Sequence, residues 1–220
     1  MDLDTTRGKY GFEKIINSFE QREVDILVGT QMLTKGLDFR FVKLVGIMNA
    51  DNLLNFPDFR AHERSYQLMA QVSGRAGRTD LRGKVLIQTY NPHHNILQQV
   101  STNAYKDMFT EQMNERYNFK YPPIFRLIKI TYKHKDYDRV NLAADWYAKS
   151  LKQLFKANVL GPEFPPVSRI RNLYHKNILV KIPQNQSLGK TKEAIRKIDN
   201  SFNAVKDFRP VRVVINVDNY

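Results

Sequence analysis

Two arginines in one short segment are the residues of this chain best suited to chemistry. Residues 71–78 read QVSGRAGR, which places Arg75 and Arg78 three positions apart and beside glycines. Side chains three apart can project to the same side at a helix end, and glycine lets the backbone approach a ligand closely. Planar guanidinium groups bind phosphate oxygens bidentately and keep their charge. The pattern indicates a site that neutralises charge on a transferred phosphoryl group; the alternative is that both arginines cap a helix or lie on the surface.

A second polar segment, residues 30–39 with the sequence TQMLTKGLDF, directly follows the apolar run VDILV at 24–28. In α/β sheets, ligands bind in loops at the carboxyl ends of parallel strands. Thr30 is placed to donate a hydrogen bond to a phosphate, and Asp38 to hold a ribose hydroxyl or orient an arginine. The alternative is an ordinary loop between a strand and a helix. The two segments together, in this order, indicate nucleotide chemistry more specifically than either does by itself.

Hydrophobic periodicity predicts the elements that position these segments. Apolar residues at helical spacing predict helices, and β-rich apolar runs predict strands. We expect helices over 12–22 and 60–74, strands over 24–28, 41–48 and 84–89, and a long helical stretch over 95–118. Strands that alternate with helices favour an α/β fold with a parallel sheet covered on both faces.

A different pattern follows Pro122-Pro123, where neither proline can continue a helix. We expect strands over 126–132, 169–171, 176–182 and 211–217, helices over 138–155 and 188–202, and a proline-rich connection over 161–166. This order predicts a small α+β sandwich of ferredoxin-like topology. The predicted domains are residues 1–100, a helical linker over 101–118, and residues 119–220.

The net charge of +13 is unevenly distributed, because residues 1–100 carry +2 and residues 101–220 carry +11. A domain this basic attracts polyanions such as nucleic acid; the alternative is a solvated, lysine-rich surface. Basic and aromatic side chains together suit single-stranded DNA, and a basic helix edge suits DNA phosphates or the acidic tail of a partner. The candidate DNA contacts are Arg169, Arg171, Tyr174, Lys176, Lys190 and Lys192.

Several classes of site are not expected. The chain has no cysteine, which excludes disulfides and thiolate metal sites. We predict no metal site at His93-His94, which lacks further ligands nearby. No apolar stretch is long enough to span a membrane, and the polar start does not resemble a signal peptide. Residues 188–191 (LGKT) only approach a phosphate-binding loop, because Gln184 stands where its first glycine would be. With no acidic box either, we expect this chain by itself neither to bind ATP tightly nor to hydrolyse it.

Residues 30–39 and 71–78 resemble motifs V and VI of superfamily-two helicases. With VKLVGIMNAD at 42–51 and FPDFRAHERSYQ at 56–67, they are similar to the primosomal protein N′ (PriA) family of replication-restart DNA helicases. The resemblance covers essentially the whole chain and is closest over 1–125. It implies a partial RecA-like lobe two, followed by a C-terminal domain that binds DNA. In that family, ATP hydrolysis drives 3′→5′ unwinding of DNA at stalled replication forks. The same proteins initiate primosome assembly at these forks.

The resemblance also implies roles for individual residues. Arg75 and Arg78, with Gln71, would serve catalysis at the γ-phosphate of ATP. Gly36, Asp38 and Gly74 would couple the nucleotide to DNA, and Thr30, Gln31 and Lys35 would contact DNA. ATP and Mg²⁺ would be held mainly by another lobe, because the chain begins inside lobe two. The family's proteins bind zinc in another region, and this chain contains none of the zinc ligands.

The implied partners are forked and single-stranded DNA, single-strand-binding protein and other primosome proteins, and the implied location is the bacterial cytoplasm at the nucleoid. The competing class is a non-enzymatic DNA-binding or adaptor module.

Overall fold

The chain divides into two units, Met1–Met113 and Asn114–Tyr220. The computed structural model describes residues 1–218 except 3, 5, 7, 9, 31–40 and 77–82. Helix α5 (Tyr105–Asn118) crosses the division between the units and contains most of the predicted linker. Within the described residues, none of the helices has the length and apolar character that crossing a bilayer requires.

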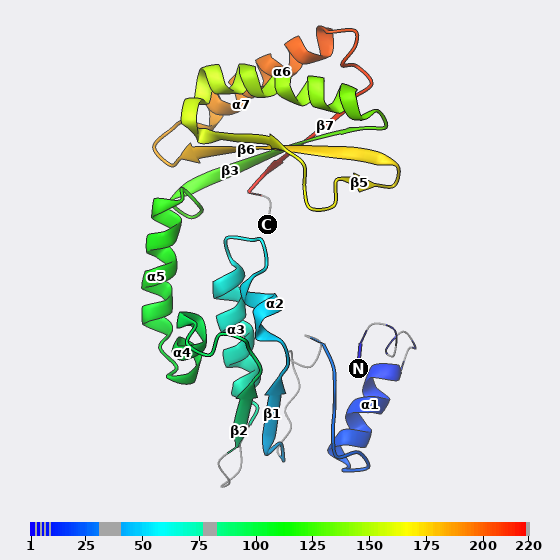
Figure 1. Ribbon diagram of the computed structural model, residues 1–220, viewed down its shortest axis with the longest axis vertical. Coiled ribbons are helices and arrows are strands. Elements are labelled where there is room, and N and C mark those ends of the chain that lie inside the picture. The colour runs from blue at the N-terminus through cyan, green and yellow to red at the C-terminus, as the bar shows by residue number, and fades with distance from the viewer. Residues whose placement is uncertain are drawn as a thin grey trace. The chain divides into compact units, whose positions relative to one another are not determined.

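The first unit contains a two-stranded parallel sheet, as the alternation of strands and helices predicted. Strands β1 (Leu44–Ile47) and β2 (Lys84–Ile87) pair in parallel, with Ile47 opposite Ile87. The helices of this unit, besides most of α5, are α1 (Gly11–Glu20), α2 (Ala50–Leu54), α3 (Ala61–Ser73) and α4 (Asn95–Ser101). Figure 1 shows β1 and β2 side by side, with α2 and α3 following β1 along the chain.

A small apolar core joins the helices of this unit to one face of its sheet. Tyr66 and Met69 of α3 are buried in it, and Ile47 and Ile87 of the strands pack against it. On the other face, Leu44 and Leu86 are 57% and 61% exposed, so the prediction that both faces would be covered was wrong for the described part of this unit. Packing against the face that carries Ile47 and Ile87 fixes the position of α3 on the sheet, and with it the position of the carboxyl end of the helix.

One predicted strand of this unit was wrong, and one predicted helical stretch is interrupted. Residues 24–28 form no strand, and Ile26 is 79% exposed. The Val28 carbonyl accepts from the Met1 amino group, and the Thr30 N–H donates to the Met1 carbonyl at 3.1 Å, but a strand needs such pairing along its whole length. The helical stretch predicted over 95–118 is divided into α4 and α5, because the chain turns at Asn103, whose φ is 54°. Asparagine tolerates this left-handed conformation better than most residues, so it suits a helix end.

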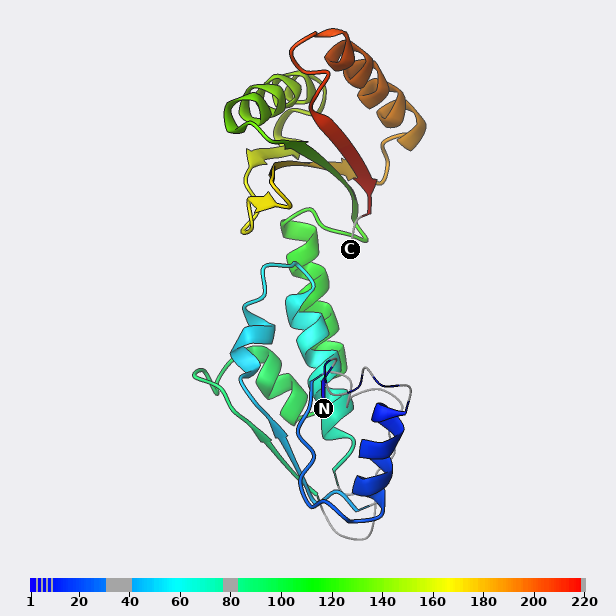
Figure 2. The same cartoon turned by 90° about the vertical axis from the view of Figure 1, so that its right-hand side faces the viewer.

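The second unit has the predicted ferredoxin-like topology. Its main strands are β3 (Phe125–His134), β4 (Val159–Glu163), β6 (Leu173–Pro183) and β7 (Arg212–Val217), in the sheet order β4-β6-β3-β7. All these pairs are antiparallel, and the short β5 (Arg169–Ile170) pairs with β6. Part of the predicted proline-rich connection is therefore strand β4. Helices α6 (Tyr137–Phe155) and α7 (Leu188–Ala204) lie over the same face of the sheet (Figures 1 and 2), and the 3-10 turn η2 (Lys156–Asn158) leads from α6 into β4.

The core of the second unit lies between the sheet and these two helices. The predicted alternation along β3 is confirmed, because Ile128, Ile130 and Tyr132 all belong to this core. Trp146 packs half-buried against this core, and its ring centroid lies 5.9 Å from that of Phe202. This packing leaves the side chains between the core residues of β3 on the opposite face of the sheet.

Candidate nucleotide-coupling and DNA-binding sites

The carboxyl end of α3 carries three of the predicted site residues. Gln71 lies in the last turn of the helix, Gly74 follows it, and the Gly74 N–H donates to the Ala70 carbonyl at 3.0 Å. The Arg75 N–H donates to the Val72 carbonyl at 3.0 Å, which continues the helical turn. Gln71 and Gly74 are exposed and Arg75 is half-buried. Arg78, the second arginine of the pair, lies outside the described residues.

An acidic side chain fixes the start of α3. Asp58 Oδ1 accepts from the Arg60 backbone N–H at 2.9 Å, and its Oδ2 accepts from Arg60 Nη2 at 2.9 Å. Arg64 Nη1 lies 3.4 Å from the same Oδ2. Hydrogen bonding to Arg60 holds the pKa of Asp58 below its ordinary value. Sequence reasoning missed this pairing, although an Asp two residues before an Arg at a helix start was the available signal.

The carboxyl ends of β1 and β2 are tied together by a second acidic residue. Asp51 accepts from Thr89 Oγ1 and from the Tyr90 N–H, both at 3.0 Å. The Ala50 N–H donates to the Gln88 carbonyl at 3.0 Å. Since both Asp51 oxygens accept hydrogen bonds from the protein, this carboxylate orders the loops at the sheet edge. Sequence analysis did not identify Asp51 either.

Of the segment that resembles motif V, only its first residue is described. Thr30 is exposed, and its N–H donates to the Met1 carbonyl at 3.1 Å. The other predicted residues of this segment lie outside the described residues: Gln31, Lys35, Gly36 and Asp38.

In the second unit, the turn between β5 and β6 brings together three predicted DNA contacts. The Arg169 guanidinium lies 5.1 Å from the Tyr174 ring centroid and donates to the Asn172 side chain. Arg171 and Asn172 form the turn, with φ values of 48° and 64°, and both are exposed. The hairpin therefore presents two guanidinium groups, whereas the half-buried Tyr174 ring packs against the core and lies 5.5 Å from the Tyr137 ring centroid.

Lys176 has a different environment from that hairpin. It is only 9% exposed, because the alternation of β6 directs it to the face that the helices cover. Its Nζ donates to Asn141 Oδ1 and lies 3.7 Å from Asp145 Oδ1 and 5.2 Å from the Phe164 ring centroid. The cation thus has partners inside the domain, which argues against the predicted DNA contact.

Lys190 and Lys192 are exposed at the start of α7. Ser187 Oγ accepts from the Lys190 N–H at 3.4 Å, and Thr191 Oγ1 donates to the Ser187 carbonyl at 3.0 Å. These bonds make residues 188–191 a capped helix start, which agrees with the helix predicted over 188–202.

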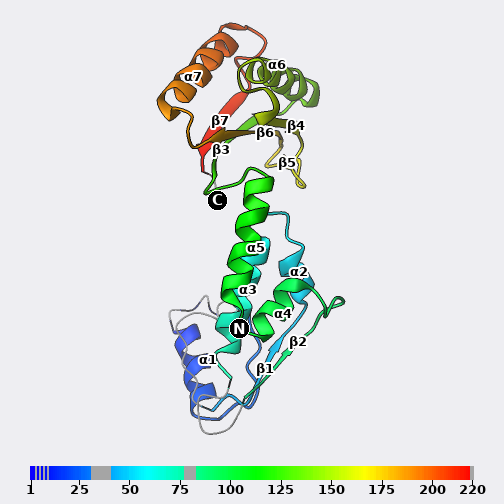
Figure 3. The same ribbon diagram turned by 90° about the vertical axis from the view of Figure 1, so that its left-hand side faces the viewer.

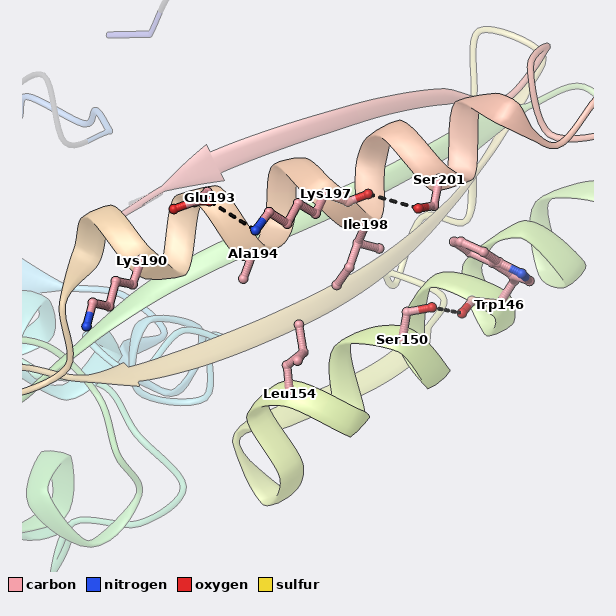
Figure 4. Close-up of a pocket in the computed structure, with 9 residues that line it drawn as sticks. All are labelled: Trp146, Ser150, Leu154, Lys190, Glu193, Ala194, Lys197, Ile198 and Ser201. Carbon is pink, nitrogen blue, oxygen red and sulfur yellow. Dashed lines mark hydrogen bonds and ion pairs between the residues drawn. The ribbon is translucent and has the colours of Figure 1, made fainter.

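A groove of about 500 Å³ runs between α6 and α7 (Figure 4). Trp146, Leu154 and Ile198 give it apolar walls, and Lys190 lies at one end. Lys197 Nζ on its rim lies 3.0 Å from Glu193 Oε1. The groove therefore combines an apolar surface with exposed cations. No group of three or more metal-ligating side chains occurs in the described parts of either unit.

Comparisons with known proteins match both units. A family described as "Primosomal protein N C-terminal domain" matches residues 117–220, and "Helicase conserved C-terminal domain" matches residues 4–80. The "Replication restart protein PriA" of Bacillus subtilis is 37% identical over 222 residues, which cover 100% of this chain. The chain belongs to the PriA family. PriA of Synechocystis is 41% identical over 83% of the chain, and PriA of Haemophilus influenzae 34% over 99%.

The chain spans 27%, 22% and 30% of the lengths of these three PriA proteins. The helicase match contains the end of α3, and the PriA C-terminal match contains the whole sheet of the second unit. The two site candidates therefore fall in two separately recognised regions of the PriA family.

Proposed function

We propose that this region is the second motor lobe and C-terminal domain of an ATP-dependent 3′→5′ DNA helicase. The helicase restarts stalled replication forks and initiates primosome assembly. The observation that carries the proposal is the carboxyl end of α3, which presents Gln71, Gly74 and Arg75 within the match to the helicase family. The PriA relatives, named for replication restart over nearly the whole chain, support the biological role.

In this proposal, ATP and Mg²⁺ are held mainly by a lobe outside this chain, and zinc is bound elsewhere in the whole protein. Arg75 and Arg78 approach the γ-phosphate when the lobes close and neutralise the charge that develops during phosphoryl transfer. Gln71 orients this segment, and Gly74 leaves room for the backbone to approach. Closure moves the lobe along DNA, with Gly36 and Asp38 coupling the nucleotide to the strand contacts.

DNA contacts are proposed in both units. Thr30, Gln31 and Lys35 bind backbone phosphates in the motor lobe. In the C-terminal domain, the hairpin of Arg169, Arg171 and Tyr174 and the helix edge of Lys190 and Lys192 add cations, with the Tyr174 ring supporting the Arg169 guanidinium. Lys176 has no role in the proposal, because its ammonium is held internally.

Protein partners are proposed at the groove between α6 and α7. An acidic peptide with an apolar side chain suits a groove that has Trp146, Leu154 and Ile198 in its walls and Lys190 and Lys197 at its edges. The proposed partners are single-strand-binding protein and other primosome proteins, in the bacterial cytoplasm at the nucleoid.

The test is the substitution Arg75→Ala in the complete helicase, with DNA-stimulated ATP hydrolysis as the measurement. We expect turnover to fall by about 10³-fold or more, as for other arginines that contact the transferred phosphoryl group. DNA binding should persist. Arg75→Lys should also be strongly impaired, because lysine keeps the charge but lacks the planar fork.

The matched control is Lys14→Ala, which removes one positive charge from an exposed position on α1. Its turnover should equal that of the unsubstituted enzyme. Undiminished turnover in Arg75→Ala would contradict the proposal and favour the non-enzymatic DNA-binding or adaptor module.

A further inference from the structure

The sheet of the second unit has one face that none of the described helices of that unit covers. Figure 3 shows α6 and α7 together on the other face. Ile128, Ile130 and Tyr132 of β3 point toward these helices. Because successive strand residues alternate, Lys129, Thr131 and Lys133 point away from them. We call this side of the sheet the open face.

Positive side chains from two neighbouring strands, β3 and β7, meet on the open face, with a histidine of β6 beside them; burial and the charge of Lys133 hold the pKa of His175 below its ordinary value. Lys133 lies in register between His175 of β6 and Arg212 of β7. Farther along β3, Lys129 lies in register between Leu179 and Asn216. Arg212 is exposed, and Lys129, Lys133 and His175 are half-buried. Among the described residues, Lys129, Lys133 and Arg212 form no ion pair.

This arrangement opposes the stability of the sheet. Like charges directly opposite each other on neighbouring strands repel. Glu163, opposite Asn177 on the edge strand, is the acidic residue nearest the pattern, and Asp218 accepts from the Leu127 N–H at 3.1 Å. The other carboxylates of the unit lie on helices or loops. A cluster that violates pairing preferences without a compensating ion pair is typical of a binding surface.

One end of the open face is already occupied by the chain itself. Lys181 is 6% exposed, because its Nζ donates to the Phe119 carbonyl at 2.6 Å and lies 3.8 Å from the Tyr121 ring centroid. The cations available to a ligand are therefore those toward the other end, around Lys133.

We propose that the open face binds single-stranded DNA, with Lys129, Lys133 and Arg212 on its phosphates. This deepens the proposed function, since it assumes the same DNA partner but adds a separate contact surface. The row through His175, Lys133 and Arg212 spans about 10 Å, and Lys129 lies about 13 Å from Lys133 along β3. A sheet can therefore offer cations to several successive phosphates.

The residues between the cations favour a single strand over a duplex. Asn216 offers its amide to base edges, and Leu179 and Val214 offer apolar contact to base faces. Asn177 Oδ1 accepts from Thr131 Oγ1 at 2.9 Å, so its NH2 group is the part left to a base. In a duplex, stacking hides the base faces and pairing hides the Watson–Crick edges, and only the groove edges stay accessible.

Phe125, at the end of β3 next to the occupied Lys181, is the one aromatic residue among the open-face positions of β3; no phenylalanine, tyrosine or tryptophan lies on those of β7 or between His175 and Lys181 of β6. Binding should thus be mainly electrostatic, with little sequence preference.

The test compares two variants of the 220-residue chain with equal charge. One is K129Q/K133Q/R212Q, and the control is K149Q/K152Q/K206Q, three exposed lysines away from the sheet. A fluorescent oligothymidylate is titrated at increasing salt. Each lost phosphate contact reduces the slope of log K against log salt by about 0.7, so the open-face variant should lose about 2 in slope. At 0.1 M salt this corresponds to about 100-fold weaker binding.

Photo-crosslinking gives a second readout that does not depend on the triple variant folding. p-Benzoylphenylalanine in place of the exposed Asn216 should capture the oligonucleotide, whereas the same group in place of Lys149 should not.

The open-face proposal would be overturned if the two triple variants weakened binding equally. It would also be overturned if the crosslinker captured DNA only from position 149, or captured only a duplex. The proposed motor function would still stand in each case. If the unsubstituted chain bound no DNA at all, the proposed DNA function would fail with it.

Discussion

Two buried tyrosines should limit the stability of the second unit at alkaline pH. Tyr132 on β3 and Tyr147 on α6 are 0% exposed, with ring centroids 5.4 Å apart. Neither hydroxyl has a hydrogen-bond partner of acceptable geometry. Burial raises the pKa of both hydroxyls above the ordinary value, and the negative charge of Asp199 raises the pKa of Tyr147 further.

The sign and size of the effect follow from proton linkage. In the unfolded chain both hydroxyls ionise near pH 10, whereas in the folded unit they stay protonated. The folded state then binds more protons, so stability is fully present below pH 10 and falls as pH rises above it. The limiting slope is about 1.4 kcal/mol per pH unit for each tyrosine. Between pH 10 and 11, each costs about 1 kcal/mol and the pair about 2 kcal/mol.

The assay is urea unfolding followed by the fluorescence of Trp146, the one tryptophan of the chain, which packs against the same core. The double variant Y132F/Y147F should lose about 2 kcal/mol less free energy of unfolding than the unsubstituted chain between pH 10 and 11. Each single variant should recover about half of that difference.

At pH 7 the tyrosine substitutions should have small effects. Removing a hydroxyl without a partner breaks no hydrogen bond, so the free energy of unfolding should change by less than about 1 kcal/mol or rise. Lysines that also titrate near pH 10 are the same in all variants. An alkaline loss of stability that is identical with and without the two hydroxyls would refute the argument.

Two further predictions concern β4 and the groove. Gly161→Ala should lower the free energy of unfolding by at least about 1–2 kcal/mol, because Gly161 has a φ of 92° and an added Cβ would lie 2.7 Å from the Asn177 carbonyl. Gly189→Ala, where the nearest atom would lie at 3.8 Å, is the control, and equal stability of the two would count against this. K190E/K197E should weaken the binding of an acidic peptide from single-strand-binding protein by about tenfold or more. This binding can be measured by the fluorescence of Trp146 at the groove. K149E/K152E should bind the peptide normally, and equal affinities in both variants would contradict the groove assignment.

Local sequence determined much of this protein. The alternation along residues 126–132 and the helical spacing in 138–155 predicted β3 and α6, and their order predicted the ferredoxin-like topology. The segment QVSGRAGR was expected at a helix end, and α3 ends within it. These features depend on residues close together in the chain, so periodicity alone is sufficient to predict them.

Tertiary structure decided which cations are available to a ligand. Lys176 and Lys133 are both lysines on strands, but Lys176 faces α6 and is held by Asn141 and Asp145, whereas Lys133 lies on the open face. His175, Lys133 and Arg212 come from three strands, and only the register of β6 and β7 against β3 places them in one row. Likewise, the apolar run at 24–28 is no strand, because a strand requires backbone pairing along its whole length as well as a suitable sequence. The local alternation decides which side chains of a strand share a face and so restricts its register, but which strands become neighbours is decided only by pairing between distant parts of the chain.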